Sequence, residues 1–141
     1  MSNPEEARIA GRLSIAYMMA IASEVLRRFP VDMLDLLLIT TISNFNLPGG
    51  GGTGDLSDPA PARIGVSRNA VSRAINVPLE TVRRRVAALI GKKILMERPD
   101  GIVFSPDNPI GLGNNADLSQ FNLGLLRQLF RELKANGIDL G

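Results

Sequence analysis

The sequence of residues 67–106 is SRNAVSRAINVPLETVRRRVAALIGKKILMERPDGIVFSP, and it predicts two short helices followed by a β-hairpin. The first helix is expected over 69–75, where the chain must then turn sharply at Asn76, a residue type that tolerates the left-handed backbone conformation. Pro78 fits the entry to the second helix, expected over 79–92. The apolar spacing packs the two helices at a steep angle and presents the second one outward.

Two short runs of β-forming residues follow the second helix, at 94–98 and 102–105. Between them lies a Pro99-Asp100-Gly101 turn, so the pair is expected to form a hairpin. A hairpin directly after an exposed helix is a wing, and Arg98 near its tip could reach a phosphate group or the adjacent minor groove.

The second helix has an apolar side and a cationic side. On a helical wheel Arg84 points away from the apolar side, and Ala87 and Ala88 leave the surface beside it smooth. Three consecutive arginines on an exposed helix repel one another, so folding alone gives no reason for them. An arginine fork can bind guanine O6 and N7 or a phosphate, and the major groove is wide enough for a helix. The alternative is an ordinary exposed, arginine-rich helix.

The charge of the chain is unevenly distributed. Residues 63–98 contain nine basic and two acidic side chains, a net charge of +7, whereas the rest of the chain has a net charge of −5. A basic segment within an otherwise acidic protein is typical of a polyanion site, because phosphate contacts supply most of the affinity for nucleic acid. The alternative is a solvated face that only keeps the surface soluble.

Residues 67–106 resemble the winged helix-turn-helix of bacterial transcription regulators. Within them LETVRRRVAALIGKKIL, residues 79–95, is similar to the recognition helix and first wing strand of MarR-, GntR- and CRP-type DNA-binding domains. Two positions depart from the usual pattern: Asn76 replaces the common glycine of the turn, and Lys93 replaces a helix-ending glycine. The resemblance implies a sequence-specific regulator that binds double-stranded DNA.

The resemblance also implies a role for each of ten residues. The residues expected to face base edges are Glu80, Thr81, Arg83 and Arg84. The residues expected to bind the DNA backbone are Ser67, Arg68, Arg73, Arg85 and Lys92. Arg98 is expected to serve the wing.

Helices are expected on both sides of this segment, at 4–28, 31–44 and 117–136. The fold class is therefore mainly α with a small β-hairpin wing: a winged helix-turn-helix flanked by N- and C-terminal helices. Four divisions are expected along the chain. Residues 1–45 form N-terminal helices for dimerisation or scaffolding, and 46–64 form a flexible Gly/Pro-rich loop. Residues 65–105 form the DNA-binding region, and 106–141 form a linker and the C-terminal helix.

Residues 13–26 of the first helix are apolar in nearly all directions. Such a helix is buried on all sides, and in a small protein a second copy is the natural cover for its free side. We therefore expect a homodimer on a pseudo-palindromic DNA site. The alternatives are a central core helix wrapped by its own chain and, for Met18, Met19 and Met33, a pocket for a small-molecule effector.

Composition argues against an enzyme. The chain has no Cys and no His, and we find no constellation of carboxylate, lysine or tyrosine groups at catalytic spacing, so no cofactor and no metal site are expected. The start of the chain lacks a signal peptide, and its apolar runs are shorter than a membrane span, so we expect a cytoplasmic protein that does not bind a membrane. The alternative function is a winged-helix protein-interaction module without a DNA target.

Overall fold

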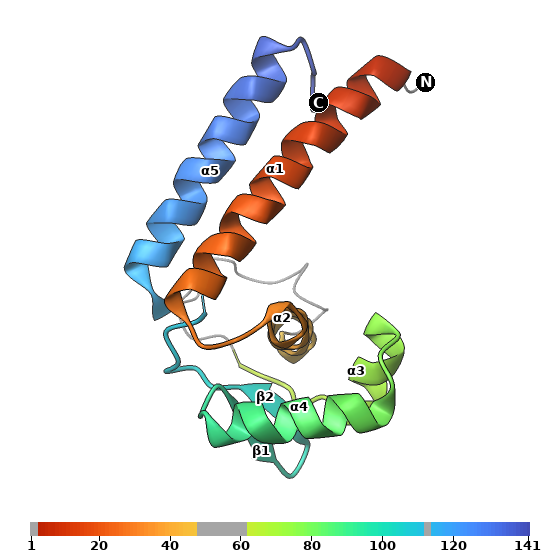
Figure 1. Ribbon diagram of the computed structural model, residues 1–141, viewed down its shortest axis with the longest axis vertical. Coiled ribbons are helices and arrows are strands. Elements are labelled where there is room, and N and C mark those ends of the chain that lie inside the picture. Colours follow the sequence, from red (N-terminus) through yellow and green to blue (C-terminus); the bar gives the residue numbers. More distant parts are fainter. Residues whose placement is uncertain (1–2, 48–61, 112–113) are drawn as a thin grey trace. The chain divides into compact units, whose positions relative to one another are not determined.

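The computed structural model describes residues 3–47, 62–111 and 114–141, and in them the chain is mainly helical with one two-stranded antiparallel hairpin (Figure 1). The chain divides into two compact units. One comprises residues 1–30 and 115–141, and the other comprises residues 31–114. The mainly helical fold with a small hairpin, expected from the sequence, is confirmed.

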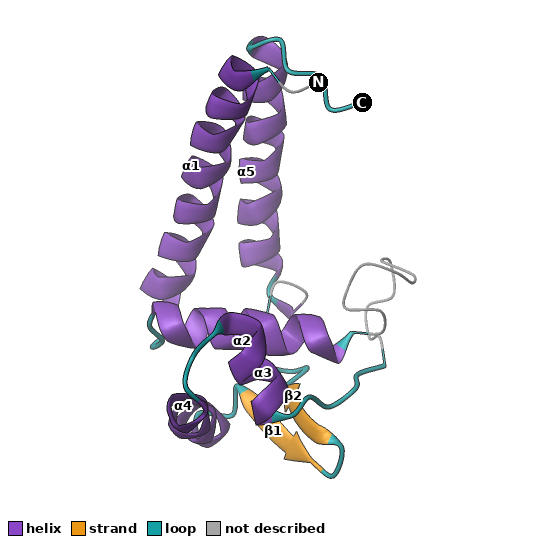
Figure 2. Cartoon of the chain, turned by 90° about the vertical axis from the view of Figure 1, so that its right-hand side faces the viewer, coloured by secondary structure: helices purple, strands orange, loops and turns teal. Residues whose placement is uncertain are grey.

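The first unit is an antiparallel pair of long helices, α1 (Pro4–Arg28) and α5 (Ala116–Ala135), which lie side by side in both views (Figures 1 and 2). Tyr17 links them by donating its hydroxyl hydrogen bond to Asn122 Oδ1 at 2.5 Å. α5 ends where Gly137 adopts a φ of 75° and the Ile138 amide donates to the Leu133 carbonyl at 3.0 Å. This is a Schellman motif, the stop that a glycine at this place predicts.

In the described residues of the second unit there are three helices and the hairpin. The elements in chain order are α2 (Met33–Asn46), α3 (Arg68–Ile75), α4 (Leu79–Gly91), β1 (Leu95–Arg98) and β2 (Gly101–Phe104). The strands pair from Leu95 opposite Phe104 to Arg98 opposite Gly101. An isolated antiparallel bridge between Val66 and Ile102 adds a short third segment to the outer edge of β2 (Figure 2).

The core of the second unit lies where its helices meet one face of the hairpin. Its fully buried apolar side chains are Leu38, Ile42, Val71, Val82, Val86, Leu89, Leu95, Ile102 and Val103. α2 contributes two of them and packs on α3, α4 and β2. α2 therefore belongs with the hairpin and α4, which differs from its expected grouping with the first helix in a segment over 1–45.

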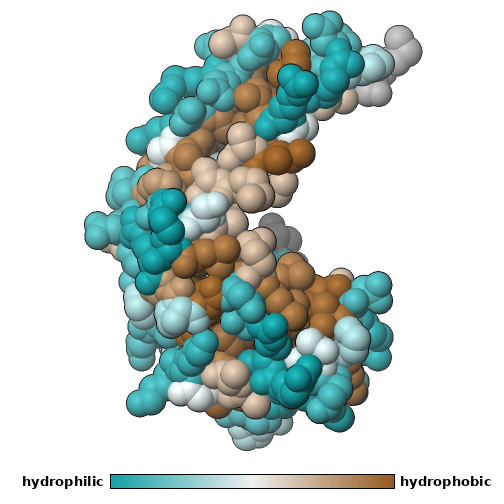
Figure 3. All heavy atoms as spheres, in the orientation of Figure 1, coloured by the Kyte–Doolittle hydropathy of each residue, from teal (hydrophilic) through white to brown (hydrophobic). Residues whose placement is uncertain are grey.

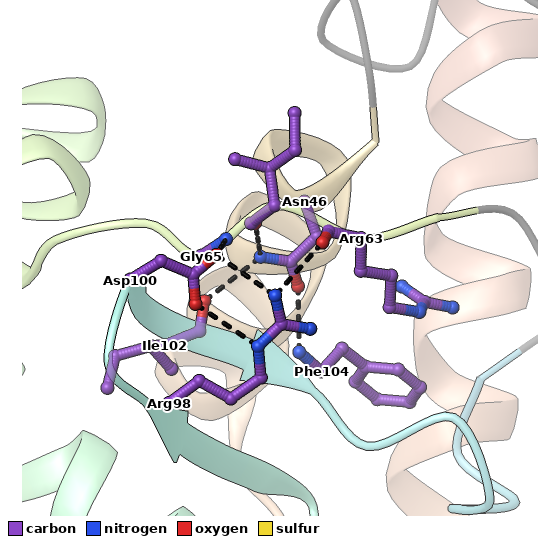
Figure 4. A network of polar contacts seen from close by, with 8 residues as sticks. Asn46, Arg63, Gly65, Arg98, Asp100, Ile102 and Phe104 are labelled. Atoms are coloured by element: carbon purple, nitrogen blue, oxygen red, sulfur yellow. Dashed lines mark hydrogen bonds and ion pairs between the residues drawn. The ribbon is translucent and has the colours of Figure 1, made fainter.

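A single buried amide joins α2 to the hairpin (Figure 4). Asn46 is fully buried; its Nδ2 donates to the carbonyls of Ile64, at 2.7 Å, and Ile102, at 3.0 Å, while its Oδ1 accepts from the Phe104 amide at 2.7 Å. The sequence predicts a flexible loop over 46–64 that includes this residue. In the structure it is the last residue of α2, and residues 48–61 of that expected loop lie outside the described residues.

Replacing Asn46 by alanine should strongly destabilise the fold. Asn46→Ala leaves the buried Phe104 amide without its acceptor and removes one donor each from the Ile64 and Ile102 carbonyls, although the Ile102 carbonyl keeps the Val66 amide. An orphaned buried group costs about 1–3 kcal/mol, so we expect a loss of about 2–3 kcal/mol in the free energy of unfolding, measured by urea denaturation. Asn44→Ala, two residues earlier on the exposed side of α2, is the control. Equal stability of the two variants would contradict the role of the buried amide.

Candidate nucleic-acid interface

The turn between α3 and α4 fixes the direction of α4. Asn76 adopts the left-handed conformation, with φ 54° and ψ 46°, as the sequence predicted. Ser72 then bonds Val77 twice: its hydroxyl donates to the Val77 carbonyl at 2.5 Å, and its own carbonyl accepts from the Val77 amide at 3.2 Å. These bonds close the turn and hold the residues that lead into α4 against α3.

α4 has one buried side and one exposed side. The side chains of Val82, Val86 and Leu89 are fully buried in the core of the second unit. The exposed residues of this helix are Glu80, Arg83, Arg84, Ala87, Ala88 and Gly91, and Thr81 is half-buried beside them. The helical wheel therefore placed the two sides of α4 correctly.

The C-terminal end of α4 is a Schellman motif built on a lysine. α4 ends at Gly91, Lys93 follows with a φ of 62°, and the Ile94 amide donates to the Leu89 carbonyl at 3.0 Å. Lys93 thus adopts the conformation for which glycine is usual at this place. Lys92 and Lys93 both remain exposed, next to the exposed side of α4.

Arg85, which the resemblance assigned to the DNA backbone, binds acidic side chains at the start of α2. Its Nη1 lies 2.5 Å from Asp32 Oδ2 and 3.2 Å from Asp35 Oδ1. Asp32 and Asp35 also cap α2 reciprocally, each accepting from the backbone amide of the other. The hydrogen bond from Arg85 lowers the pKa of Asp32 below its ordinary value of 3.8, and the Asp35 amide adds to the shift.

Two residues at the start of α3 are also engaged within the protein. Ser67 is the N-cap of α3 and accepts a hydrogen bond from the Ala70 amide at 3.1 Å. Arg68 forms a two-pronged ion pair with Glu97 of β1, at 2.9 and 3.2 Å. Hydrogen bonding to Arg68 lowers the pKa of Glu97. The pair ties α3 to the hairpin, so Arg68 also has an acidic partner.

Arg98 holds the tip of the hairpin (Figure 4). Its guanidinium donates to both carboxylate oxygens of Asp100, at 3.1 and 3.0 Å, and to the Arg63 carbonyl at 3.2 Å. The Gly65 amide donates to Asp100 at 2.8 Å, and this bond, followed by that from Arg98, lowers the pKa of Asp100. A Cβ on Gly65 would lie 2.6 Å from the Asp100 carbonyl carbon, so only glycine fits this approach.

The remaining arginines among the ten are exposed. Arg73 and Arg84 have no hydrogen-bond or ion-pair partner within the part of the chain that the structure describes. Arg83 lies 3.8 Å from Glu80, and the two side chains are 58% and 75% exposed, so this pair contributes little to stability. Besides Arg98, the exposed cations in the described part of the second unit are Arg73, Arg83, Arg84, Lys92 and Lys93.

The charge excess of residues 63–98 is smaller in the folded unit than in the sequence. Asp32, Asp35 and Asp100 lie outside residues 63–98 in the sequence and pair with Arg85 and Arg98 in the structure. Arg63 does not face solvent freely either: its guanidinium carbon lies 5.7 Å from the centre of the Phe104 ring, and burial lowers its pKa. Within the described part of the second unit, the exposed cations other than Arg98 thus lie on α3, on α4 and directly after α4.

Neither the acidic partners of the arginines nor the buried side-chain amide of Asn46 was predicted from the sequence. Asp32 and Asp35 are 50 or more residues away from Arg85, so no local pattern links them. Asp100 carried one usable signal, since it lies two residues after Arg98 in a tight turn. The three methionines proposed to line an effector pocket are exposed, at 54% for Met18, 57% for Met19 and 54% for Met33.

Comparisons with known protein families, curated proteins and solved structures found no match for this chain. In the described residues no group of three or more acidic side chains is placed to hold a metal ion.

The ion pair of Arg85 should make stability depend on pH. Because the folded-state pKa of Asp32 is lowered, its stabilising contribution is present above the ordinary value of 3.8 and is lost as the pH falls through the lowered value. We expect Arg85→Met to unfold at lower urea concentration than the wild type at neutral pH, and the difference to shrink in acid.

The matched control is Arg84→Met, which removes an adjacent charge that has no partner in the described residues. Its urea midpoint should follow that of the wild type at every pH. A deficit of Arg85→Met that stays constant down to the lowest pH would assign the effect to packing and contradict the ion pair.

Proposed function

We propose that this chain is a sequence-specific DNA-binding regulator that inserts the exposed side of α4 into the major groove. The observation that carries the proposal is the contrast between the two sides of α4. Val82, Val86 and Leu89 anchor one side in the core, while Arg84 stands on the other side with no partner in the described residues. A rigid helix with an unpaired cationic side suits a polyanionic groove.

The order of elements supports a winged helix-turn-helix as the detailed fold. α2 is followed by the short segment at Val66, then by α3, α4 and the hairpin, and Val66 bridges to β2. In this proposal α3 and α4 are the helix-turn-helix, and the hairpin of β1 and β2 is the wing. Since Arg98 binds Asp100, the tip of the wing is held in one conformation before any DNA arrives.

The exposed residues divide into two proposed tasks. Arg84, Thr81 and Glu80 lie on the outward side of α4, from which side chains would reach base edges. Arg73 and Lys92 would contact phosphates on either flank, where they fix the register. Ala87 and Ala88 are exposed and small, so they allow the groove walls to approach the helix closely.

The ion pairs within the second unit change which residues we expect to contact DNA. Arg68, Arg85 and Arg98 each have an acidic partner, and a phosphate would have to compete with that carboxylate. We therefore propose that these three residues hold α3, α4 and the wing in place, and that much of the affinity for DNA comes from Arg73 and Arg84, which have no partner in the described residues. The proposal involves no catalysis and no cofactor, and it places the protein in the cytoplasm.

The first test is selection of preferred duplexes from a random pool by the full chain. The proposal predicts an enriched sequence whose affinity falls steeply as the salt concentration rises, because phosphate contacts release counterions. If the protein binds no duplex even at low salt, the proposal is wrong and a protein-interaction module becomes the better description.

Arg84→Ala should weaken binding to the selected sequence by about 1–3 kcal/mol and relax the preference at one base position. The measurement is fluorescence anisotropy with the selected duplex and with single-base variants. The control is Arg127→Ala on α5, which removes the same charge from another exposed position and should leave the affinity nearly unchanged. An equal loss on every duplex would show that Arg84 contacts phosphate only and would refute base reading.

A further inference from the structure

α2 has an apolar side that the described part of its own unit leaves exposed. Met33, Leu37, Thr40 and Asn44 recur at the spacing of helical turns, so they share one face, and all four are exposed. Phe45 is exposed beside them. In the lower part of Figure 3, apolar surface lies over α2 and α3. Because this face carries no charge, a partner that covers it gains by removing apolar surface from water.

Between α2 and α3 the exposed face continues into a groove of about 540 Å³. The residues that line it are Thr40, Thr41, Asn44 and Phe45 of α2, and Ala74 and Ile75 of α3. The lining has no charged side chain, and Ala74 is small and exposed, so the α3 wall of the groove is low. A groove of this volume and polarity accepts apolar side chains of a ligand or a peptide.

The charge around the groove is positive. Residues 36–46 of α2 carry no charge, and Asp35 before them already pairs with an arginine of α4. α3 contains two arginines and no acid. Arg68 pairs with Glu97, whereas Arg73, directly before the groove wall, is exposed and has no partner in the described residues. The two helices that form the groove therefore present one unneutralised charge, which favours a negatively charged partner.

We propose that this face of α2 and α3 is a docking site for a second protein, which supplies an amphipathic helix with acidic residues beside its apolar stripe. In this mode of recognition, side chains at i, i+3 or i+4, and i+7 of the partner helix enter an apolar groove. α2 has 14 residues and is about 21 Å long, so it matches a partner helix of about four turns. The docking face is not the exposed side of α4, so the inference can fail or succeed independently of DNA binding.

A second copy of this chain is a poorer occupant of the groove. In a two-fold contact the same patch meets itself, so two concave grooves would face each other and neither would be filled. The contact would also bring two copies of Arg73 together, with no acidic side chain in the groove lining to separate them. Like charges that meet across an interface weaken it.

A membrane and a duplex are also poorer covers for this face. By length and composition, α1 and not α2 is the helix in the described residues that could cross a membrane. A duplex presents phosphates, and of the residues considered on this face only Arg73 could bind one. Met33, Leu37 and Phe45 would then lie against a polar, charged backbone without gain.

The first test is selection of peptides of about 16 residues from a random phage-displayed library, with the full chain as bait. We expect the enriched peptides to share apolar residues at helical spacing and a net negative charge, and to gain helicity when they bind. Because no DNA is present, this test holds whether or not the chain binds a duplex. Failure to enrich any peptide, or enrichment of basic peptides, would overturn the proposal.

Two variants with matched controls locate the binding site of the selected peptide by fluorescence anisotropy. Ala74→Glu adds bulk and a negative charge to the groove wall and should weaken binding at least about 10-fold. Asn69→Glu adds the same charge at another exposed position of α3 and should leave the affinity within about twofold. An equal loss in both variants would overturn the proposal.

Phe45→Ala covers the case in which Ala74→Glu fails to fold. Phe45 is 41% exposed, and its loss should weaken the peptide about 10-fold, whereas Met96→Ala on β1, where the side chain is 44% exposed, should not. Phe45→Ala should keep the duplex affinity of the wild type, which separates this site from the proposed DNA-binding side.

Two further outcomes would assign the face to another occupant and overturn the proposal. One is a lower mass of Ala74→Glu than of the wild type in sedimentation, which would indicate a second copy. The other is uptake of the wild type, but not of Ala74→Glu, by phosphatidylglycerol vesicles, which would indicate a membrane surface.

Discussion

The packing of the second unit depends on the hydrogen bonds of the buried side-chain amide of Asn46. This one side chain satisfies the carbonyls of Ile64 and Ile102 and the amide of Phe104, and so joins the end of α2 to the hairpin. The same hairpin continues from α4 through the Schellman motif at Lys93, while Arg85 binds the start of α2. α4 is thus linked to α2 at its middle, through Arg85, and at its C-terminal end, through the hairpin, and the orientation of its exposed side follows.

The arginines of this unit differ in their surroundings: some pair with a carboxylate of the same chain and some do not. Arg68 and Arg85 each pair with a carboxylate of an element that is distant in sequence, and Arg98 pairs with Asp100 inside the hairpin turn. Arg73 and Arg84 meet none in the described residues. The ion pairs of Arg68, Arg85 and Arg98 therefore fix the elements that carry Arg73 and Arg84, and they leave the charges of Arg73 and Arg84 unneutralised.

Local patterns sufficed to predict much of this fold. The bounds of α1, the left-handed Asn76, the two sides of α4 and the hairpin all follow from cap residues, apolar spacing and turn chemistry, which act over a few residues. The partners of Asn46 and Arg85 could not be predicted, because they lie 18 to 58 residues away and are chosen by packing. For the same reason the sequence could not show that Arg85, which the resemblance assigned to the DNA backbone, pairs with Asp32 and Asp35.

In the proposed complex the exposed side of α4 contacts the duplex while its buried side stays anchored. Backbone amide shifts followed by nuclear magnetic resonance, as a duplex is added to the full chain, test this arrangement residue by residue. We predict that the largest changes fall on Thr81, Arg84, Ala87 and Ala88, with smaller ones near Arg73. Shift changes that are confined to α2, or to α1 and α5, would contradict this arrangement. The absence of any shift change at a large excess of duplex would contradict it as well.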